Sequence, residues 1–543
     1  MGYAAGVGES ELRGLIIGRA TRHFARFRAA PRVGPCPQRR GSHVPDKRVP
    51  ILAYQNSEII AIVADITCIE VRDWGILEYQ MHTAVNGGSD SSSPRSTTMC
   101  LHDHTAAPTP KGELPRRGIL AGAAALAGIS VAGIAAQLAS APAALADNAP
   151  SGPNYPGKPL PTQAVIIEGG TVVDPKTGDA VADGVLVLDG GKVTAVGSRD
   201  ETRKAVAAVA KRARVLNASG KWVLPGLVDA HVHANALADA RALLQGGATS
   251  VRSGSSTFYQ DIALAALPSW APGLSPRMTP AGLFISPDQG DSLLADPDLA
   301  PLATLSGGVK EPQDLAYLTR VNLKRGAQVI KTRANPRAGL PEQDPRELVY
   351  NVDQIGAIVK AAKGAGVLCH AYSAEGIDGA VRAGVRSIEH GVFMTENTIS
   401  EMARRGTFFT PTMDAITSMA NSANPILAAR GKEYTPILQA AVRAAKDAGV
   451  TIVAGTDSFG TDVTPIGTEA RLLAEAGLTP LEALQAATTN AARLLGRGES
   501  VGRLVTGSMA DVVVVDSDPL TDGSALEKVS TVIAQGAVVR TNL

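Results

Sequence analysis

Residues 224–233 read Leu-Pro-Gly-Leu-Val-Asp-Ala-His-Val-His, and this stretch decides the fold. Its apolar residues predict a buried strand, at whose end His231 and His233 stand two positions apart. Residues i and i+2 of a strand point to the same side, so both imidazoles can reach one ion. The stretch therefore predicts a strand that ends in a metal site.

Seven more strand candidates follow, and amphipathic helical stretches such as 352–363 and 434–448 separate most of them. The eight predicted strands end within residues 229–233, 249–252, 278–284, 328–332, 366–372, 387–390, 407–412 and 451–457. Such β–α repeats predict an α/β fold, a (β/α)8 TIM barrel over residues 224–500 with its site at the carboxyl ends of the strands. A doubly wound open sheet is the alternative, but it does not explain polar residues at so many strand ends.

Short β-like runs lie on both sides of the predicted barrel. They cover residues 164–167, 184–188, 192–196 and 221–224 before it, and 511–515, 529–533 and 538–539 after it. Glycine pairs at 169–170 and 190–191 supply hairpin turns. The two ends therefore predict one small β-sandwich, made from residues 147–223 and 501–543.

The first 146 residues have the pattern of processing signals. Arg116 and Arg117 precede an uncharged, Ala- and Gly-rich run that ends in the small-residue cleavage motif Ala144-Leu145-Ala146. We expect residues 99–146 to be a twin-arginine-like signal peptide that exports the protein to the periplasm or the extracellular space. If it stays uncleaved, it would instead anchor the chain in a membrane, because the uncharged run exceeds the roughly 20 residues that span one.

Residues 1–98 precede this signal, although a signal peptide belongs at an N-terminus. Met99 is followed by a short polar stretch and the paired arginines, as a native start would be. Residues 1–98 show no sustained hydrophobic period, so we expect a non-native or disordered extension from a start codon assigned too far upstream. A genuine N-terminal module is the alternative.

Charge and cysteine content argue against a nucleic-acid-binding protein and against a disulfide-built domain. The chain of 543 residues carries 52 basic and 51 acidic residues, a net charge of +1, which gives no reason to expect a nucleic-acid partner. Three of the four cysteines lie in the first hundred residues, so the remainder cannot build a disulfide framework. We expect Cys369 to be an inert core residue and the partner to be a small-molecule substrate. A homo-oligomer stays open.

All four histidines after residue 146 fall at predicted strand ends: His231, His233, His370 and His390. A single one would be more simply interpreted as a hydrogen-bonded core residue, but four together favour a metal centre at the barrel mouth. Lys331 ends the fourth strand and Asp457 the eighth. An ammonium group would repel a metal, so Lys331 is either a buried lysine paired with Asp457 or Glu389, or a lysine carboxylated by CO2.

Residues 160–543 resemble the amidohydrolase superfamily, in particular its imidazolonepropionase-like and prolidase-like branch. The opening stretch carries this resemblance together with residues 329–331, 369–372, 387–391, 454–457, 488–496 and 507–515. It implies that His231, His233 and Asp457 hold one metal, that His370 and His390 hold a second, and that carboxylated Lys331 bridges them. Two zinc ions are the expected pair, because nitrogen and oxygen ligands suit zinc.

The resemblance implies an exported hydrolase that cleaves C–N amide bonds of dipeptides or N-acyl amino acids through a metal-bridging hydroxide. Asp457 would carry the proton to the leaving amine, and Asp229 would support a ligating imidazole. Tyr372 follows His370 on the same face and would stabilise the oxyanion, unless it only lines the mouth. Arg252 and Arg333 lie near strand ends and would bind a substrate carboxylate, unless they are ordinary surface-loop residues.

Two other functions stay open. Lactone, imidazolone or phosphotriester hydrolysis uses the same machinery. A catalytically silent metal-binding barrel is the more distant alternative, but decay of the site would remove at least one ligand, and the set is intact. The loop at residues 286–311, rich in Asp, Gly and Pro, is expected to lie over the mouth and to help select the substrate.

Overall fold

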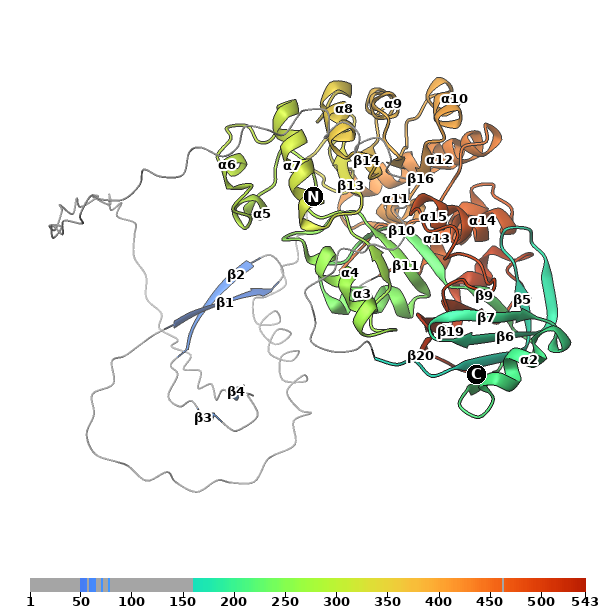
Figure 1. Cartoon of the computed structure of the whole chain (residues 1–543). Coiled ribbons are helices and arrows are strands. Elements are labelled where there is room, and N and C mark those ends of the chain that lie inside the picture. The colour runs from blue at the N-terminus through green and yellow to red at the C-terminus, as the bar shows by residue number, and fades with distance from the viewer. Residues whose placement is uncertain (1–48, 56–57, 65–69, 72–76, 79–159, 461–462) are drawn as a thin grey trace, which may run out of the picture. The chain divides into compact units, whose positions relative to one another are not determined.

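The computed structural model describes residues 49–55, 58–64, 70–71, 77–78, 160–460 and 463–543 (Figure 1). The chain divides into two units, Met1–Ala125 and Leu126–Leu543. In the first unit, β1 (Val49–Gln55) pairs with β2 (Glu58–Ala64) as an antiparallel hairpin, and β3 (Glu70–Val71) pairs with β4 (Leu77–Glu78). These strands were not predicted from the sequence. The predicted signal at residues 99–146 lies outside the described residues.

Two four-stranded parallel sheets form the centre of the second unit. One has the order β12 (Arg277–Thr279), β11 (Ala248–Ser253), β10 (Leu227–His233), β17 (Ser458–Phe459). The other has the order β13 (Ile330–Arg333), β14 (Val367–Ala371), β15 (Ser387–His390), β16 (Phe408–Thr410). Nearly every residue of these strands is buried, as expected for parallel strands covered on both faces.

Backbone contacts link the two sheets in chain order. Ile285, after β12, makes a parallel bridge to Thr332 of β13, and Phe409 of β16 makes one to Ile452. The segment after Ile452 returns to β10, where Asp457 N donates to His231 O at 2.8 Å. The eighth predicted strand, residues 451–457, therefore lies between β16 and β10, although most of it has no regular strand pairing.

Helices follow the parallel strands, as predicted for an α/β fold, and Figure 1 shows them along the outer side of the strands. They include α3 (Leu237–Gln245), α4 (Gln260–Trp270), α7 (Pro312–Arg325), α8 (Val352–Ala361), α9 (Ala374–Ala383), α10 (Glu396–Arg405), α12 (Pro425–Asp447) and α13 (Ile466–Glu475). Helix α12 begins nine residues before the predicted 434. The reason is its start signal: the Asn424 side chain accepts from two backbone N–H groups, and Pro425 occupies the first helical position.

Both ends of the described second unit share one eight-stranded sheet. Its order is β20 (Ala537–Arg540), β19 (Val529–Ala534), β18 (Val512–Val515), β9 (Trp222–Pro225), β5 (Val165–Val173), β6 (Ala180–Asp189), β7 (Lys192–Gly197), with β8 (Arg214–Asn217) also paired to β5. The ends meet where β18 pairs antiparallel with β9. Because β9 leads through Gly226 directly into β10, this sheet fixes the start of the strand that carries His231 and His233.

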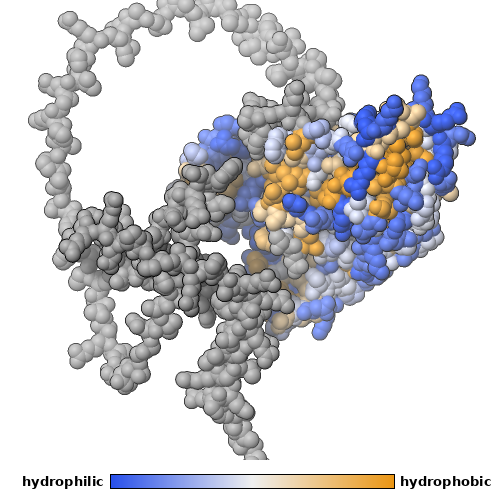
Figure 2. All heavy atoms as spheres, turned by 90° about the horizontal axis from the view of Figure 1, so that it is seen from below, coloured by the Kyte–Doolittle hydropathy of each residue, from blue (hydrophilic) through white to orange (hydrophobic). Residues whose placement is uncertain are grey.

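The loop after β12 contains two short helices, α5 (Asp291–Leu294) and α6 (Ala300–Ala303). Residues 286–311, which were predicted as a loop, are thus partly helical. Among the described helices, none combines the length and apolarity that a membrane crossing requires. Figure 2 shows apolar patches bordered by hydrophilic side chains on one face of the described surface.

Candidate metal centre

The structure brings the predicted metal ligands together at the ends of the parallel strands. Neighbouring imidazoles lie close: the ring centroids are 5.5 Å apart for His231 and His233, 5.6 Å for His231 and His390, and 4.4 Å for His370 and His390. These residues come from β10, β14 and β15. Three separate strands therefore deliver four imidazoles to one place.

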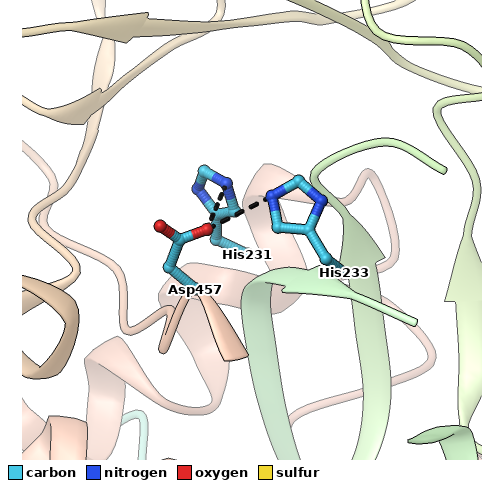
Figure 3. A group of neighbouring side chains, drawn as sticks. All are labelled: His231, His233 and Asp457. Carbon is cyan, nitrogen blue, oxygen red and sulfur yellow. Dashed lines mark ion pairs between the residues drawn. The ribbon is translucent and has the colours of Figure 1, made fainter. Parts of the chain in front are cut away.

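His231, His233 and Asp457 form the tightest group (Figure 3). Asp457 Oδ1 lies 3.3 Å from His231 Nε2 and 3.2 Å from His233 Nε2. One donor atom from each residue lies within 4.8 Å of the others. Two imidazole nitrogens and a carboxylate oxygen are the donors that zinc prefers, so this group fits a divalent metal.

Each of the four imidazoles is held by one ring nitrogen. Two rings donate to side chains: His231 Nδ1 to Glu389 Oε2 at 2.7 Å and His390 Nδ1 to Thr412 Oγ1 at 2.7 Å. The other two donate to backbone carbonyls: His233 Nδ1 to Ser255 O at 3.1 Å and His370 Nε2 to Pro336 O at 3.0 Å. Carbonyl and ionised carboxylate oxygens only accept, and the Thr412 hydroxyl donates to Pro411 O. The bonded nitrogen therefore carries the hydrogen, and the other nitrogen keeps the lone pair that a metal needs.

Burial keeps the imidazoles of His231, His370 and His390 neutral. It lowers the pKa of His231 to about 4 and that of His390 to about 3, and it holds the pKa of His370 well below its usual value. These three imidazoles are thus in the neutral form that metal binding requires.

Lys331 lies in β13 with 2% of its surface exposed, and its Nζ is 2.9 Å from His231 Nε2. Glu389 pairs with His231 and Arg252, while Asp457 pairs with His231 and His233. Among the described residues, neither carboxylate forms an ion pair with Lys331, so the alternative of such a pair is wrong. Burial lowers the pKa of the Lys331 amine to about 8.

Three residues at the strand ends have left-handed backbones. The φ angle is 70° at His390, 51° at Thr412 and 58° at Asp457. This conformation is costly for residues other than glycine and persists only where the surroundings impose it. Two of the three are predicted ligands and the third bonds to His390, so part of the unfavourable backbone of the described residues lies at the centre.

Arg252 does not lie where we predicted. It is 2% exposed inside the protein, and its guanidinium donates to Ala230 O at 2.6 Å, to Ser387 Oγ at 2.8 Å and to both Glu389 oxygens at 2.9 Å. These donors are therefore already engaged, and a substrate carboxylate could bind Arg252 only by breaking a buried ion pair. The prediction that Arg252 binds substrate is wrong, as is the alternative of a surface-loop arginine.

Asp229 also has a different role from the one predicted. Its carboxylate accepts from His231 N at 3.1 Å, from Thr456 N at 3.1 Å and from Thr456 Oγ1 at 2.8 Å. It therefore supports the backbone of two strands near the ligands and does not contact an imidazole. The imidazole of His231 is bonded by Glu389 instead, a residue our sequence analysis considered only as a partner for Lys331.

Tyr372 lies against the second pair of imidazoles. Its ring stacks on His390 with centroids 5.0 Å apart and an interplanar angle of 10°, and it meets His370 edge-on at 5.0 Å. Asn335 fixes the adjoining backbone, because its Oδ1 accepts from Tyr372 N at 2.8 Å. Burial raises the pKa of Tyr372 well above its usual value, so the hydroxyl keeps its hydrogen.

Arg333 follows Lys331 by two positions in β13, on the same face of the strand. Only 6% of it is exposed, and its Nε has no hydrogen-bond partner among the described residues. Its nearest acidic group is Asp288, at 3.9 Å and 91% exposed, and its guanidinium lies 5.5 Å from the centre of the Phe284 ring. Arg333 thus has a buried donor without a partner among the described residues, unlike Arg252.

One further residue at the centre escaped sequence analysis. Phe459 follows Asp457 by two positions, is 69% exposed and lies 6.0 Å from His233 between ring centroids. An exposed aromatic ring beside a predicted ligand offers an apolar contact to a bound molecule. No sequence pattern marks it, because a lone phenylalanine after a strand is ordinary.

Comparisons with known proteins agree with this geometry. The model of the amidohydrolase family matches residues 222–539. Ochratoxinase from Aspergillus niger is 31% identical over 229 residues, which are 40% of this chain and only 46%, about half, of that protein. Imidazolonepropionase from Symbiobacterium thermophilum is 27% identical over 408 residues, 66% of this chain and 92% of that protein. A Xaa-Pro dipeptidase solved with methionine in its active site is 25% identical with a TM-score of 0.58, covering 69% of this chain and 99% of that one.

Proposed function

Because this chain belongs to the amidohydrolase family, enzymes that hydrolyse carbon–nitrogen bonds, we propose that it is a binuclear metal-dependent hydrolase of amide bonds. The single observation that carries the proposal is the convergence of four imidazoles, Asp457 and Lys331 at one set of strand ends. The proposed substrates are dipeptides or N-acyl amino acids. Similarity to a Xaa-Pro dipeptidase supports this choice.

His231, His233 and Asp457 would hold the first metal, and His370 and His390 the second. Carboxylated Lys331 would bridge them, which agrees with a buried amine that has no carboxylate ion pair among the described residues. Zinc suits this donor set. When bound, the metals would supply a water acidified towards neutral pH and a Lewis acid for the scissile carbonyl.

Residues of the chain itself would transfer the proton and stabilise the oxyanion. The Asp457 side chain is 25% exposed, whereas His231 is fully buried, so Asp457 is open to an incoming substrate. Its carboxylate would take the proton of the attacking water and deliver it to the leaving amine. The Tyr372 hydroxyl, fixed by stacking on His390, would donate to the developing oxyanion.

We further propose that Arg333 binds the carboxylate of the substrate, because its Nε lacks a partner among the described residues. Arg333→Met is expected to raise KM for substrates with a free carboxylate by about 10- to 100-fold, the effect of losing a charged hydrogen bond. Amidated substrates should change little. Arg346→Met, which removes an exposed arginine paired with Glu433, is the control. Equal KM changes for acid and amide would reject this role.

Metal analysis and a substrate screen test the function. We expect the purified protein to contain about two divalent metals per chain by elemental analysis and to lose hydrolysis when a chelator removes them. The zinc-loaded enzyme is then offered dipeptides, N-acyl amino acids, lactones, imidazolones and phosphotriesters. Hydrolysis of only the last three classes would favour the alternative activities. Metal binding without any hydrolysis would indicate a catalytically silent barrel, and absence of metal after mild purification would refute the mechanism.

Three structural proposals accompany this function. The bridges at Ile285 and Phe409 support closure of both parallel sheets into one (β/α)8 barrel over residues 224–500. The shared sheet supports a small β-sandwich from residues 147–223 and 501–543. Export through residues 99–146, with 1–98 as an extension, predicts a mature N-terminus near Asp147 by N-terminal sequencing. Export would disfavour imidazolonepropionase activity, which serves histidine breakdown inside cells.

A further inference from the structure

A fully buried carboxylate lies behind the metal centre. Glu389 is 0% exposed, and its Oε2 accepts from His231 Nδ1 at 2.7 Å. Arg252 donates to both of its oxygens at 2.9 Å, and the Ser387 hydroxyl donates to Oε1. Burying one charge alone is costly, but here an opposite charge and several hydrogen bonds accompany it.

This arrangement decides which nitrogen of His231 faces the metal position. Because Arg252 balances the charge of Glu389, the carboxylate stays ionised and can only accept hydrogen bonds. His231 Nδ1 must therefore carry the hydrogen, and Nε2 keeps its lone pair. That lone pair lies on the side of Asp457 and Lys331, 3.3 Å from Asp457 Oδ1 and 2.9 Å from Lys331 Nζ.

The same pair connects the strands that carry both groups of ligands. Arg252 Nε, from β11, donates to the carbonyl of Ala230 at 2.6 Å, directly before His231 in β10. Glu389 is the residue before His390 in β15. Glu389 of this ion pair thus bonds to the ring of His231, a proposed ligand of the first metal. It also lies in β15 next to His390, a proposed ligand of the second metal.

We propose that Glu389 and Arg252 form a positioning pair that sets the tautomer of His231 and couples the two metal positions. The inference rests on the proposed function for its metals, but the tautomer is a property of the metal-free protein. Hydrogen-bond partners of ligating imidazoles typically change metal affinity by about 10- to 100-fold. Glu389 bonds to His231 and precedes His390 in the sequence. Its loss should therefore weaken the binding of both metals and not of the first alone.

The test removes both charges together, since removing only one leaves the other buried and unpaired. In Glu389→Leu/Arg252→Met, where neither new side chain can accept from His231 Nδ1, we expect the protein to fold, affinity for the first metal to fall about 10- to 100-fold, and affinity for the second to fall as well. Both affinities are measured by competition with a chelator. Glu469→Gln is the matched control: Glu469 is also fully buried, but it accepts from Met413 N and Asp414 N, and no metal affinity should change.

A measurement on the wild-type protein does not depend on whether the variant folds. In metal-free protein with ¹⁵N-labelled histidine, and with His231→Asn to assign the signal, the His231 ring should carry its hydrogen on Nδ1 at neutral pH. A hydrogen on Nε2, or unchanged metal affinities in the double variant, would overturn the proposal. An Nδ1 hydrogen in a protein that hydrolyses no amide would refute the proposed substrate class and leave the positioning pair intact.

Discussion

Lys331→Ala is expected to abolish hydrolysis and to lower the metal content of the purified protein. The amine is buried 2.9 Å from His231 Nε2, and the proposed bridge requires its carboxylated form. Loss of a residue outside the ligand shell typically costs about 10- to 100-fold, so loss of a bridging ligand should exceed about 100-fold in kcat/KM. Elemental analysis and kinetics with the zinc-loaded variant measure both effects.

Rescue separates a lost bridge from a damaged fold. Small carboxylates such as acetate or propionate would replace the lost bridging group, and they should restore part of the activity in proportion to their concentration. Lys324→Ala, which removes an exposed lysine paired with Asp298, should keep full activity. Full activity of Lys331→Ala without any added carboxylate would show that no bridge is needed.

The positions of the proposed ligands could be predicted because each of them belongs to a short local pattern. His231 and His233 alternate at the end of one strand, and the other four proposed ligands lie in or beside strands that the β–α rhythm had already located. Parallel neighbours bring their carboxyl ends to one edge whatever the loops contain, so the convergence of the six residues follows from the strand order. The helices were predictable for the same local reason, apart from an early start such as that of α12.

Long-range pairings could not be predicted in this way. Arg252 lies in a strand that is buried over its whole length, and its guanidinium bonds to a carboxylate 137 residues away in the sequence. The bond from His231 to Glu389 spans 158 residues. Contacts over such separations leave no periodic signal in the sequence. Arg252 was therefore predicted to bind the substrate, and Asp229 was predicted to support a ligating imidazole. The positive φ angles at His390 and Asp457 arise from the same tertiary constraints.

Gly254→Ala is expected to destroy the first metal position while the protein stays folded. Gly254 follows β11, and its N–H donates to Val232 O at 2.7 Å, between the two histidines of β10. A Cβ atom there would lie 2.6 Å from His231 Cδ2, 2.7 Å from His231 Nε2 and 2.9 Å from His233 Nε2. Real contacts are not that short, so both rings would have to move.

The rings cannot move without losing what orients them, because His231 is bonded to Glu389 and His233 to Ser255 O. Displacing both should lower the affinity for the first metal by more than about 100-fold, since it disturbs two ligands together. Overpacking of this kind costs about 1–3 kcal/mol of stability, which leaves the fold intact. Gly339→Ala, whose Cβ would meet nothing within 4 Å, is the control. Normal metal content and activity in Gly254→Ala would mean that the two imidazoles do not bind metal through the nitrogens that face Asp457.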